Sequence, residues 1–419
     1  MDKFINKRCE WIFNGFHRCG YEIYTVGGCV RDSILGIQPK DIDFCTNATP
    51  EQMRYISRFI KYYSHMEVEI IPTGEKFGTL TFRFPEFDEQ YEITCYRSDG
   101  RYTDGRHPNE VSYAKTLEED LKRRDFTCNA IAWNPIKGYI DPFNGRQDIE
   151  NKIIRCVGNP EERFNEDALR IIRLVRFALK YKFEIDMDTY KAAKKLIDNI
   201  QYVSKERIGA EFVKIFSYKY VDCFKTSKNY KTYDLLVSLL RKIFPNCQRD
   251  EVVQNIVLGH KVPLLRWYSA CIGENEQSTT TFINQFAVGS EICNGVKNLN
   301  RAFKFLKNSN IYWKDKKVLD IVRTPDERKA LISKLIDESR DVEDIVQAIV
   351  NDEPYSIEQL EVDGNWVMNY LNMKPGPEVK KVLEDILNFV CASPGSNTEE
   401  DIKDFLDKNY IEVDNDNNS

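Results

Sequence analysis

The hydrophobic pattern of this chain changes near residue 150, and that change restricts the folds open to it. Before this point, short runs rich in β-branched and aromatic residues, such as YEIYTVGG, GTLTFRF and YEITCYR, are separated by Gly, Pro and Asp. After it, apolar residues recur at helical spacing, as at Leu169, Ile172 and Val175. The sequence therefore predicts an α+β protein in which a mixed β-sheet precedes a series of all-α domains.

The composition excludes several classes of protein. The hydrophobic and charged fractions, 42% and 30%, are those of a globular protein. No window approaches the roughly 18 apolar residues of a membrane span, and the first residues lack an apolar stretch of signal-peptide length, so we expect a cytoplasmic protein with no membrane partner. The 12 cysteines show no CxxC spacing and often lie in apolar runs, as at Cys95, Cys128 and Cys156. This pattern predicts reduced core residues and no zinc site.

The net charge of −6 does not favour nucleic-acid binding over the whole surface, because proteins that bind phosphates usually present a basic patch. Local basic segments exist, since DLKRRDF, RIIRLVRFALKYK and RAFKFLKNSNIYWKDKK mix Lys and Arg with aromatic residues. Taken alone, each of them is more typical of a solvated helix face. An interaction with RNA would therefore depend on local patches.

The segment TVGGCVRDSILGIQPKDIDF brings a glycine pair, an arginine and two aspartates close together. In DID, the alternation of a β-strand would place Asp41 and Asp43 on one face and direct Ile42 into a core. Two carboxylates on one face repel each other unless a cation lies between them, and hard oxygen ligands suit Mg²⁺. We therefore expect Asp41 and Asp43 to be catalytic metal ligands.

The glycines of this segment predict a tight turn. Backbone N–H groups of Gly27 and Gly28 can approach phosphate oxygens because neither residue has a Cβ atom. The planar head of Arg31 can bind phosphate through two hydrogen bonds. With the two aspartates, these parts describe two-metal nucleotidyl transfer, in which a hydroxyl group attacks the α-phosphorus of a nucleoside triphosphate. Each part alone is a weak signal, because DxD is common in solvated turns, but their combination indicates a nucleotidyltransferase.

A third carboxylate would help to hold a second metal or to accept the proton of the attacking hydroxyl. Glu92, in the strand-like run YEITCYR, is the best candidate because it alternates with Thr94 on one face. The alternative is an ordinary edge-strand glutamate.

Longer motifs resemble those of one family. GGCVRDSILG with KDIDF, PTGEKFGTLTFRF, YEITCYRSDGRYTDGRHP, LEEDLKRRDFTCNAIAWNP, NEDALRIIRLVRFA and SKERIGAEF resemble the class II tRNA nucleotidyltransferases, the CCA-adding enzymes of the polymerase beta superfamily, in their bacterial form. The resemblance implies a nucleotidyltransferase head at residues 1–148, a base-recognising neck at 149–216, a helical body at 217–340 and a helical, tRNA-binding tail at 341–419.

The resemblance also implies nucleotide-binding roles for residues after the catalytic motif. Arg124 is expected to contact phosphate or sugar, and Asp125 to accept a hydrogen bond from the ribose 2′-OH, which would favour NTPs over dNTPs. Either residue could instead be a helix cap or an ion-pair partner. Arg173 and Arg176 are assigned to the nucleotide. We expect them to contact the triphosphate or to position Asp167, since each three-residue step drifts about 60° around a helix.

The motif EDALR indicates how one site could select two bases. Asp167 and Arg170 are three residues apart, hence neighbours on one helix face, and they offer an acceptor beside a donor. Cytosine and adenine each present an amino donor beside a ring-nitrogen acceptor. Uracil and guanine present the reverse order and would leave buried groups unpaired, at roughly 1–3 kcal/mol per group. Without the resemblance, this pair would more simply be a salt bridge within one helix.

The function that the resemblance implies is template-independent addition of CCA to the 3′ end of tRNA from CTP and ATP, with Mg²⁺ as cofactor. Body and tail would grip the acceptor end and the T-arm of tRNA by shape and phosphate contacts. The loop SDGRYTDGRHPNE, residues 98–110, resembles the flexible loop of complete CCA enzymes. The alternatives are an A-adding tRNA nucleotidyltransferase, a poly(A) polymerase and an inactive RNA-binding relative.

Overall fold

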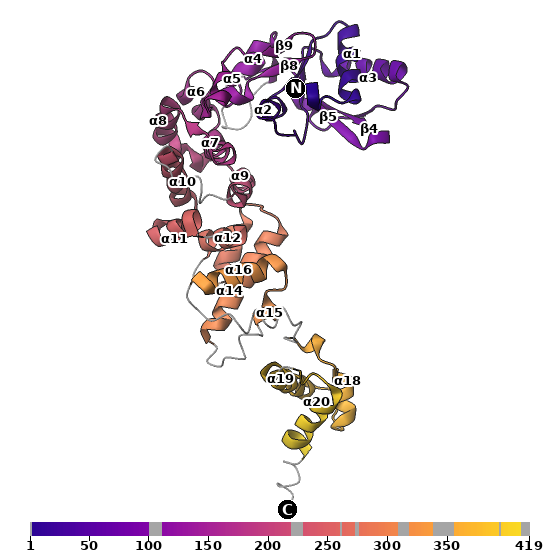
Figure 1. Ribbon diagram of the computed structural model, residues 1–419, viewed down its shortest axis with the longest axis vertical. Coiled ribbons are helices and arrows are strands. Elements are labelled where there is room, and N and C mark those ends of the chain that lie inside the picture. Colours follow the sequence, from indigo (N-terminus) through magenta and orange to yellow (C-terminus); the bar gives the residue numbers. More distant parts are fainter. Residues whose placement is uncertain are drawn as a thin grey trace, which may run out of the picture. The chain divides into compact units, whose positions relative to one another are not determined.

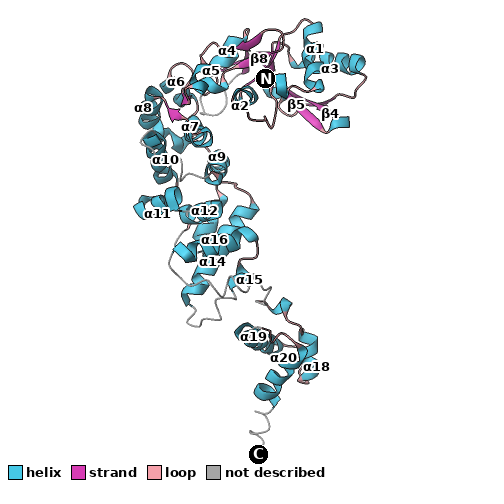
Figure 2. Ribbon diagram, in the orientation of Figure 1, coloured by secondary structure: helices cyan, strands magenta, loops and turns pink. Residues whose placement is uncertain are grey.

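The computed structural model describes residues 2–99, 111–218, 229–259, 262–272, 276–308, 318–337, 356–393 and 395–411. The chain divides into two compact units, residues 1–243 and 244–419. Within the described ranges every strand belongs to the first unit, and the second unit is helical (Figure 1, Figure 2). The prediction of a mixed sheet followed by helices is confirmed. Most of the loop at 98–110 lies outside the described residues.

The centre of the first unit is a seven-stranded mixed sheet. Strands β2 and β5 run parallel, and the other neighbours run antiparallel. Strands β1 and β2 are buried along their whole length, in agreement with their sequences IYTV and FCT. The order across the sheet is β3 (Glu69–Ile71), β4 (Thr79–Phe84), β5 (Glu89–Cys95), β2 (Phe44–Thr46), β1 (Ile23–Val26), β8 (Ala132–Asn134) and β9 (Gly138–Ile140). A separate ladder joins β6 (Arg97–Asp99) and β7 (Val111–Tyr113).

Five helices accompany this sheet: α1 (Lys7–Arg18), α2 (Gly28–Ile34), α3 (Pro50–Ser64), α4 (Leu117–Lys122) and α5 (Gly145–Glu150). Phe13 of α1 contacts Phe44 of β2 and Trp133 of β8, with ring centroids 5.4 and 5.8 Å apart. Gly15 of α1 lies against Ile60 of α3, and a Cβ atom there would clash with the Ile60 side chain. The missing side chain lets the two helices pack closely beside the sheet, as Figure 1 shows.

The rest of the first unit is mainly helical and begins after α5. The apolar series predicted for α7 (Leu169–Tyr181) is buried at each position that the sequence singled out, Leu169, Ile172 and Val175. Lys231 at the start of α10 (Tyr230–Ile243) donates hydrogen bonds to Glu184 and to the carbonyl oxygen of Ile185, at 2.9 and 2.7 Å. Helix α10 therefore packs within the first unit, and the boundaries of the four predicted domains stay predictions. The elements are β10 (Ile153–Ile154), α6 (Pro160–Glu166), α7 (Leu169–Tyr181), β11 (Glu184–Ile185), α8 (Met187–Leu196), α9 (Lys205–Ser217) and α10 (Tyr230–Ile243).

The second unit consists of short and medium helices. Its described elements include α11 (Asp250–Gln254), α12 (Pro263–Cys271), α13 (Glu276–Asn284), α14 (Ser290–Asn308), α15 (Val318–Ile321), α16 (Pro325–Asp337), α18 (Gly364–Tyr370), α19 (Pro377–Ala392) and α20 (Glu399–Leu406). The last three share an apolar core in which Val367, Val382 and Ile402 are buried.

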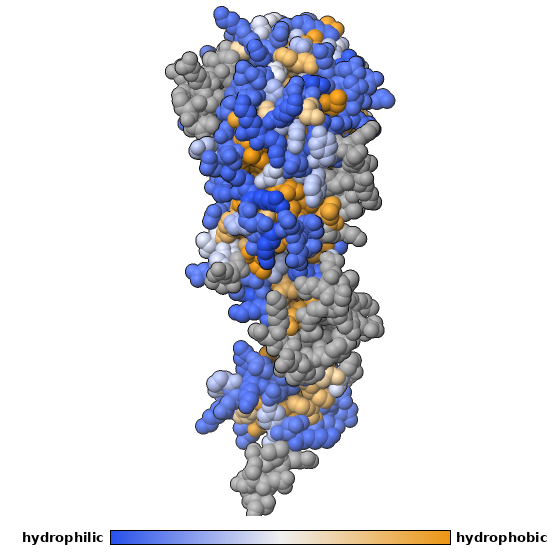
Figure 3. Space-filling model, turned by 90° about the vertical axis from the view of Figure 1, so that its left-hand side faces the viewer, coloured by the Kyte–Doolittle hydropathy of each residue, from blue (hydrophilic) through white to orange (hydrophobic). Residues whose placement is uncertain are grey.

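The surface and the core agree with the composition. On the face in Figure 3, hydrophilic residues predominate and hydrophobic residues form small groups between them. No helix in the described part of the chain is long and apolar enough to cross a membrane. Cys95, Cys128 and Cys156 are buried free thiols, as their apolar surroundings predicted.

Candidate active site

A cavity of about 630 Å³ lies in the first unit, and every predicted site residue except Glu92 lines it. It is bounded by the turn between β1 and α2, the segment before β2, the segment after α4, and helices α7 and α9. Nine of its lining side chains are cationic and four are acidic. The cationic residues are Arg31, Arg123, Arg124, Arg170, Arg173, Arg176, Lys180, Arg207 and Lys214, and the acidic residues are Asp41, Asp43, Asp125 and Asp167.

The two aspartates of DID precede strand β2 and do not lie within it. Because β2 begins at Phe44, the prediction that the aspartates alternate along a strand was wrong. Strand β1 ends at Val26, whose N–H donates to the carbonyl oxygen of Asp43 at 3.0 Å. Strand β1 therefore offers no pairing residue to the residues before Asp43. Both carboxylates are exposed and line the cavity, while Ile42 is half-buried. The expected pair of carboxylates at one site is therefore present, at the end of a ladder.

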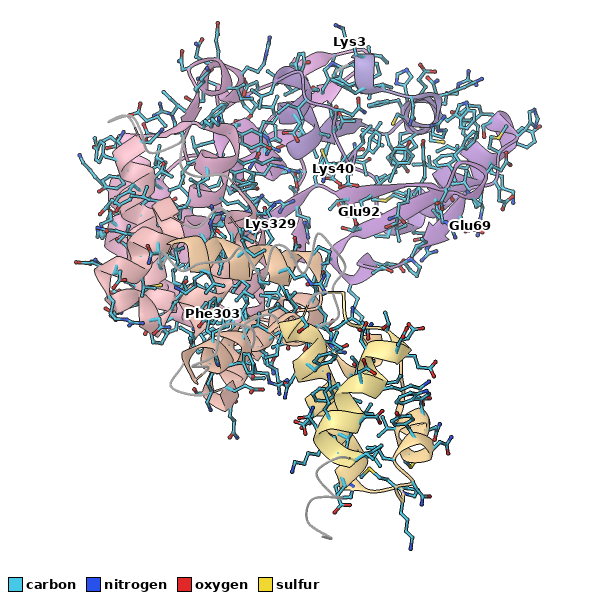
Figure 4. All side chains as sticks on the ribbon, turned by 60° about the horizontal axis from the view of Figure 1, so that its bottom comes forward. Lys3, Lys40, Glu69, Glu92, Phe303 and Lys329 are labelled. Carbon is cyan, nitrogen blue, oxygen red and sulfur yellow. The ribbon has the colours of Figure 1, made fainter. Side chains whose placement is uncertain are left out.

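Glu92 lies on the neighbouring strand. The parallel register of β2 and β5 pairs Phe44 with Ile93, which puts Glu92 level with Asp43. Figure 4 shows Glu92 on β5 and Lys40 on the segment that leads into β2. Strand β5 lies between β4 and β2, so the alternative of an edge-strand glutamate was wrong. Glu92 stays a predicted third carboxylate beside the cavity.

The carboxyl group of Asp43 has an unusual pKa. Its side chain is exposed at the cavity, but the surrounding protein removes much of the water near its oxygens. This loss of solvation, with the charges of Glu92 and Asp41, raises the pKa of Asp43 to about 6, and Arg124 opposes the shift. Around Asp43, the negative charges of Asp41 and Glu92 are therefore only partly offset by Arg124.

The turn after β1 is tight, as predicted. Gly27 has φ of 79°, in the left-handed region that favours glycine, and a Cβ atom there would lie 3.0 Å from Nη1 of Arg124. Arg31 on α2 is buried and donates from Nε and Nη2 to Asp32, at 2.9 and 2.7 Å, and from Nη1 to Asn129. These bonds hold its guanidinium group in the cavity wall.

The motif RRD is organised by ion pairs. Arg123 and Arg124 both bind the buried carboxylate of Asp120, at 2.7 and 3.1 Å. Asp125 accepts two hydrogen bonds from Arg173, at 2.9 and 2.7 Å, and one from Asn129 at 2.9 Å. Burial opposes ionisation of Asp125, but Arg173 and Asn129 outweigh it and lower its pKa to about 2. In this structure Asp125 is therefore an ion-pair partner, which is the alternative that the sequence left open.

Asp167 and Arg170 belong to different backbone segments. Asp167 ends α6 in an extended conformation, with φ of −151° and ψ of 102°, and α7 begins two residues later. The expectation that both lie on one helix face was therefore wrong. Asp167 pairs with Arg207 of α9 at 2.7 Å, and Arg170 donates to Glu166 at 2.7 Å. A salt bridge between Asp167 and Arg170, the simpler alternative, is also wrong.

The later arginines of α7 have acidic partners of their own. Arg176 and Glu211 are both buried and form an ion pair, with Nε 2.5 Å from Oε2. Arg173 reaches Asp125, as described above, and approaches Glu211 at 3.9 Å. Asp167 forms its ion pair with Arg207 and not with Arg173 or Arg176.

Several residues of the site escaped sequence reasoning. Three of them, Asp120, Arg207 and Glu211, lie in the motifs LEEDLKRRDF and SKERIGAEF. These motifs resemble the family, but the resemblance alone did not single out these three residues. Lys180 and Lys214 also line the cavity, and only helical spacing from known cavity residues could have indicated them.

The aspartates fit a hard divalent cation. Within the described residues, no group of three or more His, Cys, Asp or Glu side chains is arranged to hold a metal ion. Mg²⁺ is nevertheless commonly held by only one or two carboxylates together with substrate phosphates and water. Asp41 and Asp43 offer two carboxylates in one cavity, and the raised pKa of Asp43 reflects lost solvation and the repulsion by Glu92 and Asp41, both of which a cation would offset.

Comparisons with known proteins identify the family and the fold of this chain. A family model described as "Poly A polymerase head domain" matches residues 23–155, and one described as "Probable RNA and SrmB- binding site of polymerase A" matches residues 182–247. The CCA-adding enzyme of Bacillus stearothermophilus in complex with CTP has a similar fold, with a TM-score of 0.73 and 24% identity over 98% of this chain and 100% of that chain. The CCA-adding enzyme of Thermotoga maritima complexed with tRNA gives a TM-score of 0.66 at 18% identity, over 97% of each chain.

Curated relatives extend the similarity over the whole sequence. The CCA-adding enzyme of Staphylococcus aureus is 31% identical over 99% of this chain and 100% of its own length. That of Oceanobacillus iheyensis is 32% identical over 92% of this chain and 93% of its own length. With this identity over nearly the full length of both chains, the chain belongs to the CCA-adding enzymes, the class II tRNA nucleotidyltransferases.

Proposed function

We propose that the cavity binds CTP and then ATP, and that the 3′-hydroxyl of tRNA attacks the α-phosphorus of each nucleotide with release of pyrophosphate. The observation that carries this proposal is the meeting of Asp41, Asp43 and the base-reading candidates Asp167 and Arg170 in one cavity. Residues for charge neutralisation and residues for base selection thus lie within reach of one nucleotide.

The charges of the cavity suit a triphosphate. Nine cationic side chains face four acidic ones, although the whole chain has a net charge of −6. A nucleoside triphosphate carries several negative charges, and a cavity with a cationic lining binds and orients them. We assign the phosphates to the wall formed by Gly27, Gly28 and Arg31, where the backbone is open and a guanidinium group is held in place.

We propose Mg²⁺ as the cofactor, held by Asp41 and Asp43. When bound, it would neutralise charge on the triphosphate and lower the pKa of the attacking hydroxyl group. The contribution of the chain itself is to place both carboxylates open to the cavity. The surrounding protein raises the pKa of Asp43 to about 6, which still leaves this carboxyl group mainly ionised at neutral pH. Glu92 is proposed to assist as a third carboxylate.

Base selection is assigned to Asp167 and Arg170. A carboxylate has about four acceptor positions, so Asp167 can bind Arg207 and still accept from an amino group. Cytosine and adenine carry that amino group beside a ring-nitrogen acceptor, which Arg170 would satisfy. Arg207 therefore has the role of a positioning residue. It fixes the carboxylate against which both bases are read.

The remaining assignments follow the same logic. Arg124 would contact phosphate or sugar, Asp125 would accept the 2′-OH while Arg173 keeps it ionised, and Arg173 and Arg176 would add positive charge near the triphosphate. The helical second unit would hold the acceptor end and T-arm of tRNA through phosphate contacts. We place the reaction in the cytoplasm, where bacterial tRNA is made.

Single-turnover extension of tRNA transcripts tests the proposal. Transcripts that end before the tail, after C and after CC are each incubated with CTP, ATP, UTP or GTP, singly and together. We expect stepwise addition of C, C and A, with no use of UTP or GTP, and loss of turnover but not of tRNA binding in Asp41→Ala and Asp43→Ala. Glu86→Gln, which removes an exposed carboxylate of the head, is the control.

Other outcomes would replace the proposal. Extension of the CC-ended transcript alone would identify an A-adding enzyme, and long A tracts on any RNA would identify a poly(A) polymerase. No extension by the wild type, together with unchanged tRNA binding in Asp41→Ala and Asp43→Ala, would point to a catalytically inactive RNA-binding protein.

A further inference from the structure

The last turn of α7 contains a tyrosine that reaches from the helical part of the unit to the catalytic head. Tyr181 is half-buried, and its hydroxyl donates a hydrogen bond to Oδ1 of Asp32 at 2.9 Å. The same hydroxyl accepts a hydrogen bond from Nζ of Lys180 at 2.6 Å. No role assigned so far uses Tyr181.

The oxygen that Tyr181 contacts is the one that holds Arg31. Oδ1 of Asp32 accepts from Nε and Nη2 of Arg31 and from the Tyr181 hydroxyl. Lys180 adds an ion pair to the other carboxylate oxygen at 3.9 Å. Asp32 is thus held by Arg31 of its own helix, α2, and by Tyr181 and Lys180 of α7.

Tyr181 also contacts Arg31 directly. The centroid of its ring lies 4.6 Å from the guanidinium carbon, and the ring of Phe177 lies 5.1 Å from the same atom. The two rings are stacked on each other, with centroids 6.0 Å apart and an interplanar angle of 17°. Aromatic faces attract a guanidinium group, and this wall restricts the plane that the group can adopt.

The hydrogen bonds of Arg31 leave a defined part of it unused. A guanidinium group has five N–H donors. Nε and one N–H of Nη2 go to Asp32, and one N–H of Nη1 goes to Asn129. Within the described part of the chain, one N–H on Nη1 and one on Nη2 have no protein acceptor. Arg31 lines the cavity, so these two donors are available to a phosphate as a fork.

We propose that Tyr181 is a positioning residue that acts through Asp32 and the face of Arg31 to aim this free fork at the triphosphate. The inference rests on the proposed function, because it assigns the phosphates to the wall that contains Arg31. Tyr181 touches neither nucleotide nor metal in this arrangement. Through Tyr181, binding of the triphosphate by Arg31 would depend on the position of helix α7.

The arrangement predicts a specific kinetic pattern. The triphosphate is common to CTP and ATP, so a misplaced Arg31 weakens both nucleotides by the same factor and leaves base choice unchanged. An interaction lost equally from the bound substrate and the transition state raises KM and leaves kcat unchanged. Burial raises the pKa of Tyr181, which keeps its hydroxyl a donor throughout the working range of pH.

The test compares Tyr181→Phe with Tyr190→Phe. Tyr190 on α8 also donates a hydrogen bond to an aspartate, Asp234, at 2.8 Å, but Asp234 pairs with Lys194, which does not line the cavity. We expect Tyr181→Phe to raise KM for CTP and for ATP equally, by about 3- to 10-fold, as for the loss of one hydrogen bond. kcat should stay within about twofold, and Tyr190→Phe should change neither constant. Tyr181→Leu, which also removes the ring, should raise KM further.

A double-mutant cycle with Arg31→Lys identifies the route of the effect. In that background Tyr181→Phe should have no further effect on KM, because the fork is already gone. Additive effects, a fall in kcat alone, unequal effects on CTP and ATP, or an equal effect of Tyr190→Phe would each overturn the inference. Thermal unfolding of each variant shows whether it is folded. If the wild-type protein extends no tRNA, the proposed function fails, whereas an active wild type with an unaffected Tyr181→Phe refutes the positioning role alone.

Discussion

Replacing Asp43 by Asn should remove activity and stabilise the metal-free protein. In the folded state the pKa of Asp43 is about 6, against an ordinary value of 3.8. The causes are the loss of water around its oxygens and the negative charges of Glu92 and Asp41. A shift of about 2 units corresponds to about 3 kcal/mol at most, at about 1.4 kcal/mol per unit. Because the side chain is exposed at the cavity, solvent screens much of this penalty, and we expect a net gain of about 1 kcal/mol in Asp43→Asn.

The sign of the effect fixes its dependence on pH. The raised pKa means that ionised Asp43 destabilises the fold above pH 6, whereas below its unfolded pKa the carboxyl group is protonated in both states and has no effect. The gain of Asp43→Asn should therefore be complete at pH 7.5 and shrink as the pH falls toward 4.

Thermal unfolding in EDTA at pH 7.5 and pH 4.5 measures this gain. For a unit of this size, about 1 kcal/mol corresponds to a rise in Tm of about 2–4 °C. Added Mg²⁺ should raise the Tm of the wild type and close the gap, since it relieves the same repulsion. Glu86→Gln is the control and should show no gain at either pH. A variant that is less stable than the wild type in EDTA at pH 7.5, or a gain that persists unchanged at pH 4.5, would refute the reasoning.

Three further substitutions address other parts of the site. Gly27→Ala should lower the free energy of unfolding by about 1–2 kcal/mol in urea denaturation, because φ of 79° is strained for any residue with a Cβ atom. Asp125→Asn should cost about 2 kcal/mol at pH 7, since it removes the buried carboxylate that pairs with the half-buried Arg173 and whose pKa is lowered to about 2. That cost should shrink as the pH falls toward 2, because a lowered pKa stabilises the fold only where the group is ionised. Arg207→Gln should release Asp167 and raise the use of UTP relative to CTP by about tenfold in single-nucleotide extension, and unchanged selectivity would contradict the positioning role of Arg207.

Local patterns in the sequence were sufficient for the type and order of the elements. The period of two in GTLTFRF and YEITCYR predicted strands, and the spacing of Leu169, Ile172 and Val175 predicted the buried face of α7. These predictions were confirmed because the repeat of a strand or helix decides which side chains share a face. The ends of elements were less accurate. Asp43 and Asp167 lie just outside the strand and the helix that their spacing suggested, because ladder partners and backbone turns set the ends.

The sequence by itself determined most of the residues that enter the site, since every predicted site residue except Glu92 lines the cavity. Only the tertiary structure decided which of them pair. Asp125 binds Arg173, 48 residues away, and Asp167 binds Arg207, 40 residues away. Periodicity gives the face of a helix but not the element that packs on it, and an ion pair forms where packing brings two charges within about 4 Å. The contact between Tyr181 and Asp32 joins residues 149 apart and arises only when α7 packs beside α2.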